Sequence, residues 1–363
     1  PRLVDDLIPV ILENHDHWWA RDLTRLALVS HAWLEHCRKR LYECPSLRTY
    51  EACDRLVEAL TKNPQLTSLI RAIDLQPLSD NAAMPSPKTM YSIRFILGIR
   101  GLQRLTLGGH LAVEAERFLH AVAHVDTVRQ LSIVGSADCF PRSDHCSPVC
   151  KCNASLEWDE VLASKFHRLN SLRLVGLQLS IPLPPMLSHR LHTLYLHDVD
   201  MADGSFIDLC HGSWSALRCL DVSTSFPEET ADGIRVVIAQ CANLEVLRYQ
   251  VLSSRAQATF LDDGLPHCPS MREVHLSGTR ITSASLRSIA QAYRNLERFA
   301  LLGHDSRVNA DEWVAFVASD ELPFLRRLTT PHGTMYPPFK CWPAVADAAL
   351  VEVCRTRNIK LVS

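Results

Sequence analysis

Residues 268–303 read CPSMREVHLSGTRITSASLRSIAQAYRNLERFALLG, which is one complete strand-and-helix unit followed by the start of the next. In the apolar triplet Met271-Val274-Leu276, the last two residues are two apart, as on one face of a β-strand. The apolar spacing then changes to three and four, as on one side of an amphipathic helix. The expected N-cap of this helix is Ser283 or Ser285.

The same triplet recurs along the chain from Ile70 to Leu325. The successive first positions are 32, 26, 41, 22, 26, 27, 27, 25 and 29 residues apart. A period this regular predicts a repeat protein with one strand and one helix in each unit. Such units stack into a curved solenoid, with a parallel sheet on the concave side and helices on the convex side. Near the C-terminus we expect a cap made of a helix at 344–355 and a strand at 359–362.

The unit at 268–303 resembles the cysteine-containing leucine-rich repeat. Cys268 stands three residues before Met271, and Cys241 stands three residues before Leu244. The resemblance implies an α/β fold: a leucine-rich repeat solenoid that winds as a right-handed superhelix. We place this solenoid, with its C-terminal cap, at residues 45–363.

Residues 1–44 have a different pattern, which predicts three short helices. Pro9 is acceptable in the first turn of the first helix, where its missing N–H has no partner to lose. Ser30 is the expected N-cap of the third helix. The apolar stripes of the three helices are Leu7, Ile8, Ile11 and Leu12; Leu23, Leu26, Ala27 and Val29; and Ala32, Trp33, Cys37 and Leu41.

The strings DDLIPVIL (5–12) and LALVSHAWL (26–34) resemble an F-box of the form common in fungal F-box proteins. An F-box followed by leucine-rich repeats is the layout of the substrate receptors of SCF ubiquitin ligases. The family's Leu-Pro opening stands here as Leu3-Val4, so a proline that contacts the adaptor in the family is missing. The resemblance implies that the F-box binds a Skp-type adaptor, and through it a cullin, with Leu3, Leu7, Ile8, Ile11, Leu26, Val29 and Trp33.

The concave face of the predicted sheet carries the residues that alternate with the buried strand positions. Five arginines against two acids make this face more basic than the whole chain, which suits an acidic or phosphorylated protein substrate. The alternative is that these residues are polar only because any exposed strand face must be. The face consists of Arg104, Gln130, Arg173, Tyr195, His197, Asp221, Arg248, Glu273, His275, Arg298 and Arg327.

The composition is that of an ordinary globular protein, with 38 Lys and Arg against 40 Asp and Glu in 363 residues. A net charge of -2 gives no general attraction to nucleic acid or to anionic lipid, so we expect neither as a partner. No apolar run is long enough for a membrane helix, and the acidic N-terminus is unlike a signal peptide. We therefore expect a cytoplasmic or nuclear protein. Its first residue is Pro1 rather than Met, so we expect residues ahead of it.

Most of the 13 cysteines lie in apolar periodic segments, where a free thiol packs as a small hydrophobic group. The insertion at 139–152 is richer in ligand types, with Cys139, His145, Cys146, Cys150 and Cys152. These ligands would be enough for a tetrahedral zinc site, but Cys150-x-Cys152 is closer than the usual ligand spacing. We therefore interpret the insertion as a loop with free thiols and expect no metal, with a zinc site as the alternative.

The sequence lacks the short motifs that bind phosphates, hold catalytic zinc or position a nucleophile. We therefore expect no enzymatic activity and no cofactor. The predicted function is the substrate-recognition subunit of an SCF-type ubiquitin ligase. One alternative is a protein-binding scaffold whose degenerate F-box packs only on its own repeats. Another is a hydrolase that uses Cys or His, although the sequence contains no recognisable motif for such an enzyme.

Overall fold

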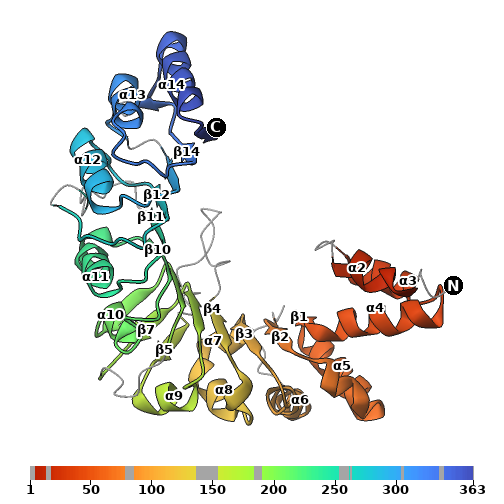
Figure 1. The fold of residues 1–363 in the computed structure, drawn as a ribbon. Helices are drawn as coiled ribbons and strands as arrows, with labels where there is room; N and C mark the ends of the chain where they lie inside the picture. Colours follow the sequence, from red (N-terminus) through yellow and green to blue (C-terminus); the bar gives the residue numbers. More distant parts are fainter. Residues whose placement is uncertain are drawn as a thin grey trace, which may run out of the picture. The chain divides into compact units, whose positions relative to one another are not determined.

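A computed structural model describes residues 5–13, 18–77, 86–135, 154–183, 190–252, 261, 264–303, 306–334 and 339–362. The chain forms two compact units, Pro1–Ser155 and Leu156–Ser363. In each unit a parallel sheet has helices along one side (Figure 1). Leu3 and the cysteine-rich insertion at 139–152 lie outside the described residues. Among the described helices, none combines the length and the apolarity needed to cross a bilayer.

The described part of the first unit begins with α2 (Leu7–Glu13), α3 (Ala20–Leu26) and α4 (His31–Glu43). Both α2 and α3 pack against α4. As expected, Ser30 is the N-cap of α4, and its hydroxyl accepts a hydrogen bond from the Trp33 N–H. We call these helices the N-terminal module. Its core consists of Ile8, Leu12, Leu23 and Cys37.

The sheet of the first unit is parallel and follows the chain order. Its strands are β1 (Ser46–Leu47), β2 (Ala72–Leu75), β3 (Arg104–Gly108) and β4 (Gln130–Val134). The helical segments after the module are α5 (Tyr50–Lys62), η1 (Pro64–Leu69), α6 (Pro87–Leu97), α7 (His110–Val113), α8 (Ala115–Ala121) and η2 (Val125–Thr127).

The second unit continues the same architecture, with the strand order β6-β8-β10-β11-β12-β13-β14-β17. These strands are β6 (Ser171–Val175), β8 (Thr193–His197), β10 (Cys219–Thr224), β11 (Val246–Val251), β12 (Glu273–Ser277), β13 (Arg298–Leu302), β14 (Arg327–Thr329) and β17 (Lys360–Val362). The helices are α9 (Glu160–Lys165), α10 (Phe206–Cys210), α11 (Pro227–Gln240), α12 (Ser283–Ala292), α13 (Ala310–Ala318) and α14 (Ala344–Thr356). Smaller pairings join β5 (Ser155–Glu157), β7 (Gln178–Ser180) and β9 (Asp200–Asp203), and also β15 (Gly333–Thr334) and β16 (Lys340–Cys341).

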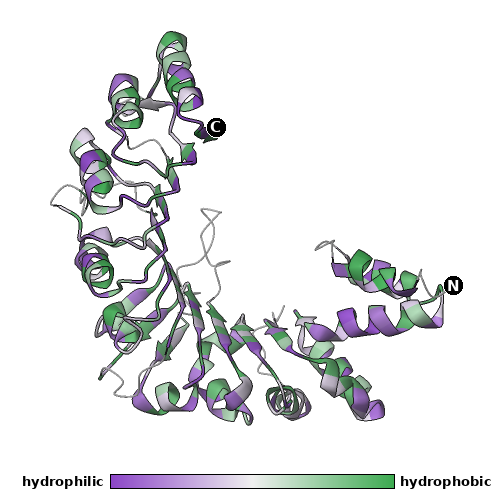
Figure 2. Cartoon of the chain, in the orientation of Figure 1, coloured by the Kyte–Doolittle hydropathy of each residue, from purple (hydrophilic) through white to green (hydrophobic). Residues whose placement is uncertain are grey.

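The strand register places equivalent positions of successive triplets beside one another. Val274 pairs with Leu247 on one side and with Phe299 on the other. All three are buried, and apolar residues interleave with polar ones along the strands (Figure 2). Each such side chain contributes about 1.5–3 kcal/mol when it is fully buried. The predicted α/β repeat architecture, with one strand and one helix in most units and a parallel sheet, is therefore confirmed.

Details at the ends of elements also follow the sequence. The cap expected at 344–355 and 359–362 is present as α14 and β17. The N-cap of α12 is Thr282 and neither of the two expected serines. Thr282 accepts a hydrogen bond from the Ser285 N–H, while the Ser285 hydroxyl accepts one from the Thr282 N–H. Ser285 therefore completes the capping box three residues into the helix.

A left-handed turn follows several strands of the second unit. Gly176, Asp198, Gly278 and Gly303 all have positive φ angles directly after β6, β8, β12 and β13. At Gly278, φ is +65°, and a Cβ atom would lie 2.3 Å from the Val251 carbonyl oxygen. The close approach of the preceding repeat therefore requires glycine at this turn.

We expect Gly278→Ala to lower the free energy of unfolding by roughly 3 kcal/mol or more, because it combines a left-handed backbone with a backbone clash. Gly264→Ala is the matched control, since Gly264 has φ +81° with nothing within 4 Å of its Cβ position. This control carries only the conformational cost of roughly 1–2 kcal/mol. Urea denaturation of both variants measures the difference, and equal losses would contradict the packing argument.

Candidate binding surface

The residues predicted to line the sheet surface all lie on strands, and they alternate with buried positions. Arg104 is on β3, and its Nε atom donates to the Gln130 side chain on β4 at 2.8 Å. The other predicted residues belong to the second unit. Most of them are exposed or half-buried, and only Glu273 is buried. They are Arg173 on β6, Tyr195 and His197 on β8, Asp221 on β10, Arg248 on β11, Glu273 and His275 on β12, Arg298 on β13, and Arg327 on β14.

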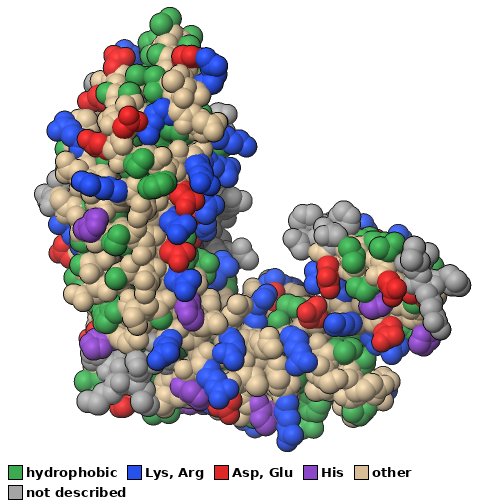
Figure 3. Space-filling view, viewed as in Figure 1, with side chains coloured by type: hydrophobic (Ala, Val, Ile, Leu, Met, Phe, Trp, Pro, Cys, Tyr) green, Lys and Arg blue, Asp and Glu red, His purple; other side chains and the backbone are tan. Residues whose placement is uncertain are grey.

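The parallel register arranges these side chains in rows that cross the strands, which lie about 4.8 Å apart. In Figure 3, basic and acidic side chains alternate in a column along these strands. The first row is Ser171, Thr193, Cys219, Val246, Glu273, Arg298, Arg327 and Lys360. The second row is Arg173, Tyr195, Asp221, Arg248, His275, Ala300, Thr329 and Val362.

Glu273 organises the middle of the surface. One carboxylate oxygen accepts a hydrogen bond from Arg248 Nη2 at 2.9 Å, and the other lies 2.5 Å from Arg298 Nη2. The Glu273 side chain is 3% exposed, whereas the side chains of Arg248 and Arg298 are 45% and 52% exposed. A buried carboxylate thus holds two arginines whose side chains remain about half exposed.

The neighbours of Glu273 decide its protonation state. Burial by itself raises the pKa of this carboxyl, but the hydrogen bond from Arg248 and the charges of Arg298 and His275 outweigh burial and lower it. The pKa of His275 is lowered because the ring is desolvated, although Glu273 acts against this shift from 3.2 Å. At neutral pH, Glu273 is therefore charged and His275 is neutral.

Two further groups in the second unit border this network. Desolvation raises the pKa of Asp221, although Arg248 Nη1 lies 3.8 Å away and acts in the opposite direction. Cys219 lies beside Tyr195 on the same face, and burial raises its pKa to about 11. A thiol that stays protonated at neutral pH is a poor nucleophile, so Cys219 is expected to make packing and polar contacts on this surface.

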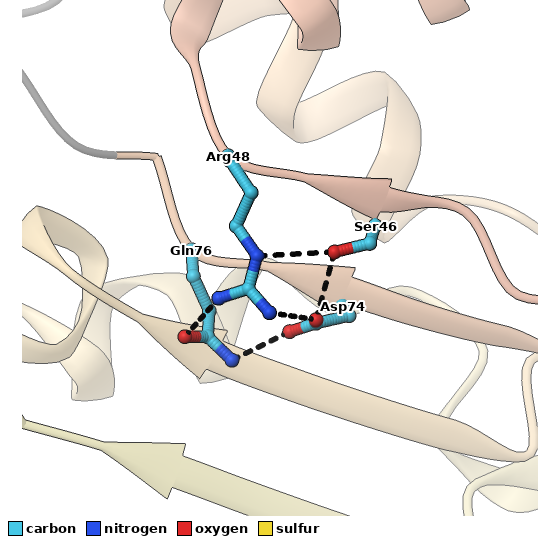
Figure 4. Close-up of polar contacts among 4 residues, drawn as sticks. All are labelled: Ser46, Arg48, Asp74 and Gln76. Atoms are coloured by element: carbon cyan, nitrogen blue, oxygen red, sulfur yellow. Dashed lines mark hydrogen bonds and ion pairs between the residues drawn. The ribbon is translucent and has the colours of Figure 1, made fainter. Parts of the chain in front are cut away.

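The first unit has a separate polar network between β1 and β2 (Figure 4). Arg48 donates from its three nitrogens to Ser46 at 3.1 Å, to Gln76 at 2.6 Å and to Asp74 at 2.8 Å. Ser46 and Gln76 both donate to Asp74 as well. The network therefore satisfies its own polar groups and fastens the first strand to the second.

The repeat pattern did not single out this network. Asp74 lies between Ile73 and Leu75, which is the same position in its triplet that His275 occupies in a later one. This triplet position could have indicated that Asp74 lies on the exposed face of the sheet. Ser46 and Arg48 precede the first triplet, so nothing in the repeat pattern indicated that they would meet Asp74.

The N-terminal module divides the residues assigned to adaptor binding into two groups. Ile8 is fully buried in the module core, and Leu26 and Trp33 are half-buried against that core. A contact through Ile8 is therefore excluded in this conformation. The accessible group consists of Leu7, Ile11 and Val29, which are 50%, 40% and 66% exposed.

Other apolar side chains of the module that the sequence did not single out are exposed as well. Val10 and Leu28 are 48% and 84% exposed, and both adjoin predicted residues in the sequence. Trp19 is 63% exposed, and the guanidinium carbon of Arg21 lies 4.6 Å from the centre of its ring. On α2, Leu7, Val10 and Ile11 have the spacing of one helix face.

The described residues contain no group of three or more His, Cys, Asp and Glu side chains that could hold a metal ion. Cys241 and Cys268 are buried between repeats, and burial raises the pKa of Cys241 to about 12. Cys268 Sγ lies 3.5 Å from the Leu244 carbonyl oxygen, within reach of a weak hydrogen bond. These thiols therefore pack as core groups.

No protein-family model and no curated protein sequence matches this chain. Among solved structures, the chain is similar to an internalin from Listeria monocytogenes. The two are 11% identical with a TM-score of 0.39, and the match covers 82% of this chain and 74% of the internalin. A likeness this remote says nothing about what this chain binds.

We expect Glu273→Gln to lower the free energy of unfolding by about 1–3 kcal/mol, because two neighbouring guanidinium groups lose their common anion. Hydration of the half-exposed arginines keeps the loss below that of a fully buried pair. Glu352→Gln is the control, since this carboxylate pairs with Arg355 on the exposed side of α14. Chemical denaturation at pH 7 measures both variants, and equal effects would contradict the role of Glu273.

The contribution of Glu273 depends on pH. Its folded pKa lies below the ordinary value of 4.5, so the carboxylate stabilises the fold above about pH 4.5. This contribution is lost as the pH falls through the lowered folded pKa. We expect the stability difference between Glu273 and Glu273→Gln, measured in a His275→Gln background, to be constant from about pH 6 to 8 and to shrink below pH 4.5. A difference that does not change with pH would contradict this assignment.

Proposed function

We propose that this chain is the substrate-recognition subunit of an SCF-type ubiquitin ligase. In this proposal the N-terminal module is an F-box that binds a Skp-type adaptor, and through it a cullin. The exposed face of the repeat sheet binds the protein substrate. The chain itself catalyses no reaction, and ubiquitin transfer belongs to its partners.

The exposed apolar residues of the N-terminal module carry this proposal. The module already buries Ile8, Leu12, Leu23 and Cys37 in a core of its own. Even so, Leu7, Val10, Ile11, Leu28 and Val29 remain between 40% and 84% exposed. Three of them, Leu7, Val10 and Ile11, lie on one face of α2, and exposed apolar side chains gathered on one helix face are typical of a protein-interaction site.

The repeat fold supports the second half of the proposal. Solenoids of this type present an extended row of side chains from many strands, which suits a protein ligand better than a small molecule. The Glu273 network holds Arg248 and Arg298 in fixed positions before any ligand arrives. Such preorganisation reduces the entropy lost on binding.

The receptor would contribute to ubiquitin transfer by position. Holding substrate lysines close to the conjugating enzyme raises their effective concentration and needs no catalytic group on this chain. A scaffold with a degenerate F-box remains the second candidate, because Val4 occupies the place of the family's proline. The two candidates differ in whether the exposed apolar residues of the module bind an adaptor.

We expect co-expression with a Skp-type adaptor to give a one-to-one complex in size-exclusion chromatography. Val29→Asp should abolish this complex and leave the melting temperature unchanged, because the Val29 side chain is 66% exposed. Val345→Asp is the matched control, with the same substitution at an 83% exposed position on α14.

The same experiment distinguishes the two candidates. If the full chain elutes alone while folded, the ligase proposal fails and the scaffold takes its place. If Val29→Asp and Val345→Asp weaken the complex equally, the adaptor does not bind through the exposed apolar residues of the module.

A further inference from the structure

We propose that the exposed face of β13, β14 and β17 binds an acidic segment of a partner protein, through carboxylate or phosphate groups. We call this part of the sheet the terminal basic face; it consists of Arg298, Arg327 and Lys360 in the first row, with Ala300, Thr329 and Val362 in the second. The inference rests on the proposed protein-binding function and narrows it to one chemistry and one place.

Three cations lie side by side in the first row of this face. Arg298 pairs with Arg327 in the strand register, and Arg327 pairs with Lys360. Neighbouring strands are about 4.8 Å apart, and like charges directly opposite one another destabilise a sheet. Glu273 already pairs with Arg298 at 2.5 Å, so the uncompensated repulsion lies between Arg327 and Lys360, and an anion placed over these two would remove it.

Most arginines elsewhere on the sheet of the second unit have an acid beside them. The position just before each strand alternates in charge from β10 to β14, through Arg218, Glu245, Arg272, Glu297 and Arg326. Arg218 pairs with Glu245 at 3.4 Å, and Arg272 pairs with Glu297 at 3.0 Å.

The alternation stops at the last strand. The position before β17 holds Ile359, which is buried, so Arg326 has no acidic successor. Within the described ranges, no carboxylate forms an ion pair with Arg326, Arg327 or Lys360. All three are exposed, so the positive charge of this face remains available to a ligand.

The second row of the terminal basic face has small side chains, of which Ala300 and Val362 are apolar. Ala300 is buried at 7% exposure, and Thr329 and Val362 are half-buried. Leu302, at the end of β13, is 49% exposed. The cationic row thus borders a shallow apolar strip about 7 Å away, the distance of two residues along an extended chain. An extended peptide with an acidic residue two positions from a small apolar residue fits both rows.

The terminal basic face is not suited to bind nucleic acid. The three strands carry no aromatic side chain on the described positions of this face, so no base could stack there. The cationic row spans only about 10 Å, which is shorter than the phosphate contacts that single-strand binders use. The chain as a whole has a net charge of -2. A short acidic protein segment is the partner that these features favour.

The test measures binding of the full chain to fluorescein-labelled peptides by fluorescence polarisation. One peptide repeats Glu-Gly-Ala-Gly, so that Glu and Ala alternate on one face; a second has phosphoserine in place of Glu, and a third has Gln in place of Glu. We expect both acidic peptides to bind more tightly than the Gln peptide by about 10-fold or more, and the preference to decrease at high salt. Tighter binding of the phosphoserine peptide identifies phosphate as the anion, and equal binding identifies carboxylates.

The variants Arg327→Glu and Lys360→Glu should each weaken binding of the acidic peptides by about 10-fold. Arg287→Glu is the matched control, because Arg287 is exposed on α12. The melting temperature of each variant checks that the fold is retained. An equal effect of Arg287→Glu, no preference over the Gln peptide, or no binding of either acidic peptide up to about 1 mM would overturn the inference.

Two controls distinguish this inference from nucleic-acid binding and from the proposed ligase function. Tighter binding of a 12-nucleotide oligouridylate than of either acidic peptide would overturn it in favour of nucleic acid. Adaptor binding is measured on the same variants, because it depends on the N-terminal module. If the acidic peptides do not bind more tightly than the Gln peptide while the chain still binds the adaptor, this inference alone is overturned. If the wild-type chain does not bind the adaptor, the proposed ligase function is overturned.

Discussion

The buried register of the apolar triplets is the constraint on which the rest of the structure depends. Each strand of the second unit places its two triplet residues beside those of the next strand, as Val274 does with Leu247 and Phe299. A slip of one residue would turn every apolar side chain outward, at a cost that accumulates over all repeats. Because the register cannot slip, the alternate residues are also fixed, and they form one continuous exposed face on each unit.

This constraint explains the electrostatics of the exposed face. Charged residues that are about 25 positions apart in the sequence become neighbours at strand spacing, so each charge must be compatible with the repeats beside it. Glu273 neutralises the positive charges of Arg248 and Arg298 on the neighbouring strands. In the first unit, the network of Ser46, Arg48, Asp74 and Gln76 compensates charge between β1 and β2 in the same way. At β14 and β17 the compensation ends, and this difference is what makes the terminal basic face a candidate binding surface.

In the N-terminal module, the packing of the helices decides which apolar residues are buried. A helical stripe identifies apolar residues, but it does not say which of them meet other helices of the module and which remain outside. Ile8 and Leu7 are adjacent in the sequence, yet Ile8 is fully buried and Leu7 is half exposed. The packing of α2 against α4 makes that division. Leu28 is 84% exposed, and it was not part of the second predicted stripe, which ran from Leu23 to Val29.

Local spacing was enough to predict the repeat period, the strand-and-helix pattern of the repeats, the C-terminal cap and most of the residues on the exposed face of the sheet. These features depend on alternation and helical periodicity, which are properties of neighbouring residues. The count of five arginines against two acids could not predict where free charge lies. The buried Glu273 carboxylate neutralises Arg248 and Arg298, whereas no carboxylate of the described residues forms an ion pair with Arg327. Ion pairs between repeats, and burial between helices, depend on residues far apart in the chain. Only the tertiary structure brings these residues together and decides which of them remain available to a partner.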